Sequence, residues 1–402
     1  MSRTAFARAA SFALVLTASV LTVLAPAAHA SPIYGVIDLT PDRAEAIAAL
    51  NDRDDVYLSL GDDEQSGLDY AAWIRERNGN SHVIGETSIL SDGAINNAGE
   101  IITSTLLGVD GSDRRILRGK VGQGLTLLPE PALAPDELWR NYHPVAINDS
   151  GVIIGRVAIV KQLPDGGTAG FTTVFRWDAA GNVSTIDGLP PGLETVVVDG
   201  TEHLRTTSVL AVDLNNRGDI IGRVVTRDNG VVTATTPFWA PAGGTAILLT
   251  DWPAAGGAMP YHINEQGQIF GVRTVAGEQR LFRWEALTGF TDLGLKFTNG
   301  AIVDINDSGA AIGMFDDRAA LWTPAAGLQY LDEITALPTD WLMLGLFDLN
   351  NAGNIAATAL DEDRFIHAVL LLRQAAPVPE PAALALLAGG LIGVVLVRRR
   401  RA

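Results

Sequence analysis

The sequence has no cysteine, and this absence excludes several classes of protein. Its 402 residues include six His and zero Cys, so a disulfide scaffold, a thiolate nucleophile, a thiolate zinc finger and an iron–sulfur cluster are all excluded. Well-known catalytic motifs are missing as well. There is no His-Glu-x-x-His helix, no Gly-x-Ser-x-Gly elbow, no phosphate-binding loop ending in Gly-Lys-Ser/Thr and no Ser-x-Asp-x-Gly-x-x-Trp box. We therefore assign no catalytic, cofactor-binding or metal-binding residue from the sequence.

Positive charge is also scarce. The chain has 29 Lys and Arg against 46 Asp and Glu, a formal net charge of -17. Residues 31–376 alone carry a net charge of -22, because the two ends hold six of the arginines and one acid. Such a charge repels phosphate backbones and anionic headgroups, so we predict no nucleic-acid partner and favour cations or basic partners.

The first thirty residues have the three parts of a secretory signal. Arg3 and Arg8 precede an apolar run over residues 9–24, and Ala28 and Ala30 form a small-x-small cleavage site before Ser31. This order predicts export, with residues 1–30 removed as a signal peptide. The alternative is an N-terminal membrane anchor, which the Ser and Thr inside the apolar run make less favourable.

The last 25 residues have three parts as well. They are the motif Pro379, Glu380 and Pro381, a wholly apolar stretch over residues 382–397, and the basic cluster Arg398, Arg399, Arg400 and Arg401. Sixteen helical residues span only about 24 Å, which is short for a permanent membrane span. The pattern predicts a short transmembrane helix whose basic end lies in the cytoplasm. An ordinary C-terminal membrane anchor is the alternative.

This arrangement resembles the PEP-CTERM sorting signal. The resemblance implies a Gram-negative bacterium in which an exosortase recognises the tail and cleaves near the Pro-Glu-Pro motif. The chain would then be anchored transiently in the inner membrane before reaching the cell surface or the extracellular matrix.

Between the two ends, a short motif with an apolar residue followed by Asn-x-x-Gly recurs. Its six full copies are Asn96 with Gly99, Asn148 with Gly151, Asn215 with Gly218, Asn264 with Gly267, Asn306 with Gly309 and Asn350 with Gly353. A degenerate copy at Asn51 has Asp54 in place of Gly. The spacings between successive asparagines are 45, 52, 67, 49, 42 and 44 residues, in the range typical of propeller blades.

The motif predicts a hairpin turn. Asn at the first position of a type I turn bonds the backbone two residues on, and Gly at the fourth accepts a positive φ. Short β-branched strands flank the turns, and a third strand carries aromatic residues such as Trp177, Phe238 and Phe282. We predict that these aromatics form the core between blades and do not bind sugars.

Four strands per unit predict an all-β fold over residues 31–374, a seven-bladed β-propeller. The last unit lacks a fourth strand, and residues 33–39 just after the signal peptide supply one that would close the ring. A six-bladed ring with the Asn51 unit as a cap is the alternative.

The Asn-x-x-Gly units over residues 50–373 resemble the HAF repeat family of extracellular proteins. Most copies lack the His-Ala-Phe element of that family, and the nearest is His367-Ala368-Val369. The resemblance implies an extracellular repeat protein and transfers no activity.

Two features of the sequence indicate where a ligand would bind. Long segments over residues 129–144, 190–207 and 252–261 are expected as irregular loops on the face opposite the Asn turns. The same face is expected to collect the acids Asp62, Asp63, Glu64, Asp110, Asp113, Asp228, Asp316, Asp317, Asp361, Glu362 and Asp363. This acidic rim would bind cations or a basic partner, or would simply be solvated charge.

Three turns begin with an additional aspartate, Asp213, Asp304 or Asp348, as calcium loops do, but the closing Glu of such loops is absent. Calcium is therefore possible and no cofactor is predicted. The function we expect is that of a non-catalytic interaction protein of the exopolysaccharide or biofilm matrix. The alternative is a polysaccharide-active hydrolase or lyase that uses carboxylates of the propeller channel.

Overall fold

The fold is known from a computed structural model, which describes residues 33–40, 45–63, 68–89, 92–107, 113–198, 200–250, 252 and 258–374. The predicted signal peptide and the predicted sorting segment lie outside these residues. Within them, no helix has the length and apolar character needed to cross a membrane. The predicted membrane helix at residues 382–397 is not among the described residues.

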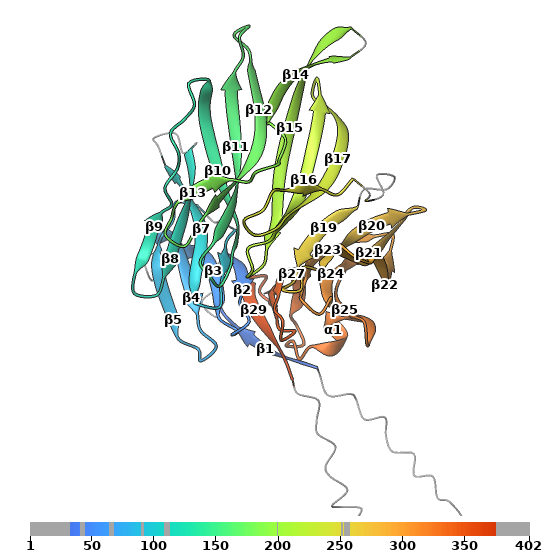
Figure 1. Cartoon of the computed structure of the whole chain (residues 1–402). Helices are drawn as coiled ribbons and strands as arrows, with labels where there is room; N and C mark the ends of the chain where they lie inside the picture. Colours follow the sequence, from blue (N-terminus) through green and yellow to red (C-terminus); the bar gives the residue numbers. More distant parts are fainter. Residues whose placement is uncertain are drawn as a thin grey trace, which may run out of the picture. The chain divides into compact units, whose positions relative to one another are not determined.

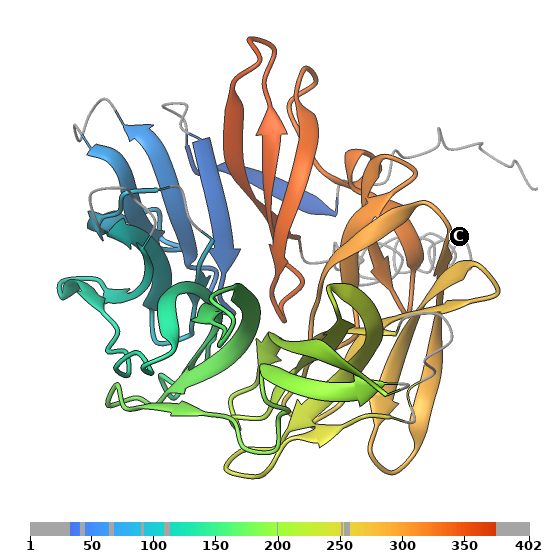
Figure 2. The same ribbon diagram turned by 90° about the horizontal axis from the view of Figure 1, so that it is seen from above.

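Seven antiparallel sheets surround a central axis, which confirms the predicted seven-bladed propeller (Figures 1 and 2). Blade 1 consists of β2 (Glu45–Leu50), β3 (Val56–Asp63), β4 (Leu68–Arg75) and β5 (Ser81–Glu86). Blade 2 consists of β6 (Ala94–Ile95), β7 (Glu100–Leu107), β8 (Asp113–Lys120) and β9 (Gly124–Leu127). Blade 3 consists of β10 (Glu137–Ile147), β11 (Ile153–Gln162), β12 (Thr168–Trp177) and β13 (Val183–Thr185). Blade 4 has five strands, β14 (Leu193–Val198), β15 (Thr201–Leu214), β16 (Ile220–Asp228), β17 (Val231–Ala240) and β18 (Ile247–Leu248). Blade 5 consists of β19 (Met259–Ile263), β20 (Ile269–Val275), β21 (Glu278–Glu285) and β22 (Gly289–Phe297). Blade 6 consists of β23 (Gly300–Ile305), β24 (Ala311–Phe315), β25 (Arg318–Thr323) and β26 (Gly327–Tyr330). A short helix, α1 (Leu331–Ile334), leads to blade 7 with β27 (Leu342–Leu349), β28 (Ile355–Leu360) and β29 (Ile366–Arg373).

The strand predicted to close the ring does so. β1 (Tyr34–Asp38) pairs antiparallel with β29, from Tyr34 opposite Arg373 to Asp38 opposite Val369. β1 is therefore an edge strand of this sheet, and Figure 2 shows it in blue together with the red strands of blade 7. The Tyr34 side chain is buried, and its hydroxyl donates to the Gly353 carbonyl at 2.8 Å. The six-bladed alternative is wrong, because β2–β5 form a full blade around the Asn51 turn.

The core is divided into seven apolar clusters, and each cluster fills the space between two neighbouring blades. The second strand of each blade explains the division, because its successive side chains point to opposite faces. In β11, Ile153 packs toward blade 2 and Ile154 toward blade 4. Both faces of a blade are therefore buried, and its strands read as continuous apolar runs.

The aromatic residues of the third strands belong to this core, as predicted. Trp177 is 1% exposed, and Phe238 and Phe282 are 0% exposed. The Trp177 indole also donates to the Pro129 carbonyl at 2.7 Å, which attaches the link between blades 2 and 3 to the core.

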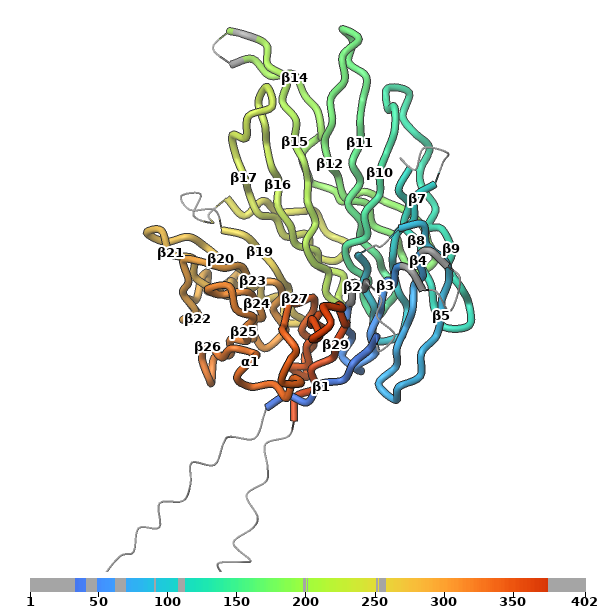
Figure 3. The backbone as a smooth tube through the Cα atoms, turned by 180° about the vertical axis from the view of Figure 1, so that it is seen from behind, coloured from blue at the N-terminus to red at the C-terminus, as the bar shows by residue number. Residues whose placement is uncertain are grey.

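The expectation of three irregular segments is wrong in large part. Most of residues 190–207 forms the β14–β15 hairpin, a fifth strand on blade 4, and β10 occupies the second half of residues 129–144. Part of residues 252–261 is outside the described residues. The long hairpins of blades 3 and 4 extend beyond the rest of the ring (Figures 1 and 3). The sequence did contain a signal for the hairpin, because Asp199-Gly200 separates two β-branched runs.

The closing strand gives the first prediction. Tyr34→Ala should lower the free energy of unfolding by about 4 kcal/mol, because it removes a buried ring and a hydrogen bond at the closure. Urea denaturation followed by circular dichroism measures this change. Leu287→Ala, at a turn residue that is 99% exposed, is the control and should stay within about 0.5 kcal/mol of the wild type. Equal stability of the two variants would refute the closure.

Candidate functional site

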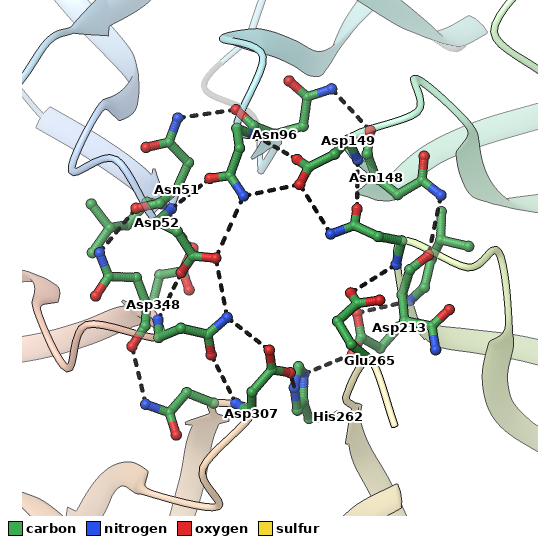
Figure 4. A pocket seen from close by; sticks show the side chains of 18 of the residues that line it. Asn51, Asp52, Asn96, Asn148, Asp149, Asp213, His262, Glu265, Asp307 and Asp348 are labelled. Carbon is green, nitrogen blue, oxygen red and sulfur yellow. Dashed lines mark hydrogen bonds and ion pairs between the residues drawn. The ribbon is translucent and has the colours of Figure 1, made fainter. Parts of the chain in front are cut away.

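The seven Asn turns converge at one end of the central channel. Each joins the first strand of a blade to the second, where β15 counts as the first strand of blade 4 because β14 is the additional strand of that blade. All seven turns therefore lie on one face of the ring and near its axis (Figure 4). Together they surround a cavity of about 230 Å³, lined by six of the asparagines, all except Asn264, and by the residues before and after the seven asparagines.

Each turn uses its asparagine in the same way. In blade 3, the Gly151 N–H donates to the Asn148 carbonyl at 2.9 Å, and Gly151 has a φ of 75°. The Asn148 Oδ1 accepts the N–H groups of Ser150 at 3.1 Å and Val152 at 2.9 Å. In the degenerate blade 1 turn, Asp54 takes the Gly position with a φ of 66°. The carboxamide oxygen is thus occupied within its own turn, and its NH2 group is left to bond elsewhere.

That NH2 group reaches the next blade, which the sequence did not predict. Six asparagines donate through Nδ2 to the backbone carbonyl of the next asparagine in the ring, at 2.9 to 3.1 Å. Asn264 instead donates to the Asp307 carbonyl at 3.4 Å. The circle closes where Asn350 donates to the Asn51 carbonyl at 3.0 Å. We call these seven links the asparagine circle, and all seven side chains are buried.

A second circle lies beside it, made by the residues that follow the asparagines. In ring order they are Asp52, Asn97, Asp149, Asn216, Glu265, Asp307 and Asn351. Among the described residues, six backbone N–H groups of this set donate to the side chain of the next blade at 2.7 to 2.9 Å. Carboxylates and amides alternate, so amide N–H groups lie between neighbouring negative charges.

Alternation around an odd number of positions must fail once, and it fails between Glu265 and Asp307. His262 lies at this place (Figure 4). Its Nε2 contacts the Asp307 carboxylate at 3.0 Å, and its Nδ1 contacts the Asp213 carboxylate at 2.8 Å. Burial lowers the pKa of His262, but Asp213 and Asp307 outweigh burial and raise it to about 10. His262 is therefore a doubly donating imidazolium at neutral pH.

The three aspartates noted as a possible start of calcium loops bond the backbone of neighbouring blades. Asp213 accepts the Ile263 N–H at 2.9 Å, Asp304 accepts the Leu349 N–H at 2.8 Å, and Asp348 accepts the Leu50 N–H at 2.8 Å. Burial raises the pKa of both Asp304 and Asp348, and their proximity raises that of Asp348 further. No group of three or more His, Asp or Glu residues suited to a metal ion occurs within the described part of the chain.

This end of the channel therefore has carboxylates, but they are held by protein donors. The backbone N–H groups and amides that fix them would compete with a substrate for the same oxygens. The arrangement suits the joining of blades better than acid–base chemistry on a sugar.

The opposite face has a larger groove between blades 2 and 3. Its volume is about 980 Å³, and the starts of β8 and β10 and residues 130–133 line it. β10 runs from this groove to the Asn148 turn, so the groove and the asparagine circle lie on opposite faces. Leu133, Leu138 and Trp139 are each about half exposed there, at 49%, 48% and 46%.

Two arginines hold one wall of this groove. Arg115 pairs with Asp113 at 2.9 Å and with Glu130. Arg140 is buried, donates to the Pro131 carbonyl at 2.8 Å and pairs with Glu137. Both arginines thus fix the segment that begins at Glu130.

Arg114 is placed differently from these two arginines. Its Nη1 lies 3.0 Å from the His143 Nδ1, and no carboxylate of the described residues lies within ion-pair distance. Burial lowers the pKa of His143, and Arg114 and Arg156 lower it further. His143 is therefore neutral and accepts the hydrogen bond without cancelling the charge of Arg114.

The predicted acidic rim is only partly available to a ligand. Asp113 pairs with Arg115, and Asp228 pairs with Arg205 at 2.7 Å, which lowers the pKa of Asp228. Asp361 accepts the Phe365 N–H at 2.7 Å and lies 3.3 Å from His367. Glu64 and Asp110 are outside the described residues, as are the side chains of residues 62 and 63. Local partners hold three of these acids, so the rim hypothesis loses support.

The asparagine circle predicts that each buried Nδ2 donor stabilises the fold. Asn148→Asp keeps the oxygen that the turn needs but removes the NH2 group that bonds blade 4. We expect a loss of about 3 kcal/mol in the free energy of unfolding, because a buried carboxylate would face a carbonyl. Denaturant titration at pH 7 measures it. Asn299→Asp, at an exposed position, is the matched control, and a similar loss in both would show that the circle is not the cause.

His262 gives a prediction about pH. A folded pKa of about 10 against about 6.5 in the unfolded chain means that His262 stabilises the fold fully below pH 6.5. This stabilisation declines as the pH rises and is lost above pH 10. His262→Gln should therefore cost about 3 kcal/mol at pH 6, and the cost should shrink toward pH 10. Urea midpoints of both proteins from pH 6 to 10 measure it, and a cost independent of pH would contradict the assignment.

Solved structures with a similar fold include several enzymes. A puromycin hydrolase is 14% identical with a TM-score of 0.38, and the match covers 67% of this chain but only 45% of the hydrolase. A catalytically inactive virginiamycin B lyase from Staphylococcus aureus, with quinupristin, is 12% identical with a TM-score of 0.44, covering 84% of this chain and 98% of the lyase. The polysaccharide lyase Uly1 is 12% identical with a TM-score of 0.40, covering 82% and 78%. Identities and TM-scores this low assign none of the activities of these enzymes to this chain.

No curated protein matches the chain. Its C-terminal residues do match a known signal, because residues 377–401 fit the PEP-CTERM protein-sorting motif. That motif indicates recognition by an exosortase and export, so the chain is an exosortase-sorted protein of the cell surface or the extracellular space.

Proposed function

We propose that the exported propeller is a non-catalytic interaction module that binds an exopolysaccharide of the cell surface or biofilm matrix. The groove between blades 2 and 3 is the observation that carries this proposal. It has the size of a ligand site, about 980 Å³, and it exposes Trp139 beside Leu133 and Leu138. A tryptophan face and neighbouring hydrogen-bond donors suit the apolar face and polar edge of a sugar ring.

The processing of the chain is part of the same proposal. Residues 1–30 would be removed after Ala30, and residues 375–402 would anchor the chain in the inner membrane until the exosortase acts near Pro379-Glu380-Pro381. Residues 31–374 would remain as the mature propeller. Its similarity to HAF-type repeats supports an extracellular role.

The non-catalytic part of the proposal depends on the channel carboxylates. Asp213, Asp304 and Asp348 accept backbone N–H groups of neighbouring blades, so they serve as acceptors within the fold. A hydrolase or lyase would need a carboxylate pair that is free to act on the glycosidic bond or a sugar proton.

Trp139→Ala tests this function. The purified full-length chain is incubated with exopolysaccharide from its own host, and bound protein and released reducing ends are measured in the same samples. We expect the wild type to be retained without release, and Trp139→Ala to bind about tenfold more weakly, because an aromatic contact is worth about 1.5 kcal/mol.

Leu287→Ala, exposed on another blade, should bind like the wild type. Retention unaffected by Trp139→Ala would exclude the groove as the site. Released reducing ends would replace the binding function with an enzymatic one.

A further inference from the structure

We infer that the groove between blades 2 and 3 holds a subsite for an acidic sugar, in which Arg114 binds the carboxylate and Trp139 packs against the ring. This inference rests on the proposed function and adds the class of ligand. Among the described residues, every charged arginine that lines the groove pairs with a carboxylate except Arg114.

The charges of the groove are mostly paired within the wall. Asp113, Arg115 and Glu130 form one cluster, with Arg115 between the two acids. Arg140 and Glu137 form a buried pair, with side chains that are 6% and 7% exposed. Arg114 is the one lining cation left without a carboxylate among the described residues.

Arg114 is also held ready for a ligand. Its hydrogen bond to His143 uses one of five N–H donors and fixes the direction of the guanidinium. No other hydrogen bond from the Arg114 side chain occurs within the described part of the chain. A guanidinium with free parallel N–H groups binds a carboxylate through two hydrogen bonds, and charge-assisted bonds of this kind are strong.

The net charge of the chain restricts the ligand further. At -17, the protein repels a polymer with a dense row of negative charges, such as a nucleic acid. One unpaired arginine therefore favours a ligand whose negative charges are widely spaced. A glycan with one uronic acid among neutral sugars satisfies this condition and also offers an apolar ring face to Trp139.

The test compares two probes that differ only at their carboxyl groups. One is a hyaluronan tetrasaccharide, with one glucuronate in every two sugars, and the other is the same tetrasaccharide with its carboxyl groups reduced to alcohols. Calorimetry or fluorescence titration of the full-length chain gives both affinities. We expect the wild type to prefer the acidic probe about tenfold, as one charge-assisted contact provides.

Arg114→Gln should abolish this preference by weakening the binding of the acidic probe about tenfold. A purely structural role of Arg114 would weaken both probes equally, so the ratio of the two affinities separates the roles. Arg227→Gln is the matched control, since Arg227 lies in β16 of blade 4 and does not line the groove. It should keep the preference of the wild type.

The outcomes distinguish the two levels of the proposal. Equal affinity of the wild type for both probes, with loss of both in Trp139→Ala, would overturn the acidic subsite and leave the binding function standing. A preference that persists in Arg114→Gln would also overturn the subsite. If neither probe binds, the inference fails, and retention on the host exopolysaccharide decides the proposed function separately.

Discussion

The structure depends on one side chain that bonds two turns at once. A carboxamide has an acceptor and a donor on the same short stem, so each asparagine closes its own turn through Oδ1 and reaches the next blade through Nδ2. Aspartate could do only the first of these. Because the links run around the whole ring, every blade is fixed by both of its neighbours, and the apolar clusters between blades pack in a register that the circle has set.

The point where the ring closes has the same bond and additional ones. Asn350 links blade 7 to blade 1, although its partner Asn51 is 299 positions away in sequence. Asp54, which replaces the usual glycine, accepts hydrogen bonds from Asn350 at 2.8 Å and Asn354 at 2.6 Å, and pairs with Arg77 at 3.0 Å. The turn without glycine thus accepts backbone strain at φ 66° and gains a buried anchor across the closing interface.

The sequence predicts much of this fold because the turns impose a local pattern. Asn at the first position and Gly at the fourth follow from the needs of a single turn, so both can be recognised without knowledge of the ring. The partner of each Nδ2 cannot be predicted in that way, because it lies in another blade. The role of His262 is equally hidden, since it follows from an alternation around seven positions that fails between Glu265 and Asp307.

The sequence does not predict the candidate groove either, because the groove also depends on contacts between residues of different strands. Net charge favoured cations as ligands, but pairing decides what a surface binds, and local arginines hold Asp113 and Asp228. Arg115 and Arg140 pair with the nearby acids and leave Arg114 without a carboxylate among the described residues, and the sequence shows none of these pairings. Residues 129–144 were expected to form an irregular loop, but β10 begins within them, and its exposed Trp139 lines the groove.

The two faces of the ring therefore differ in how far the lengths of their strands and turns can change. The asparagine circle fixes where each first strand ends, and any change of length there would break two bonds. Length can change at the other face, where β15 has 14 residues and the corresponding β23 has 6. This explains why the turn is nearly constant while the spacing between asparagines ranges from 42 to 67 residues. A ligand site on the free face can change with the ligand while the circle preserves the fold.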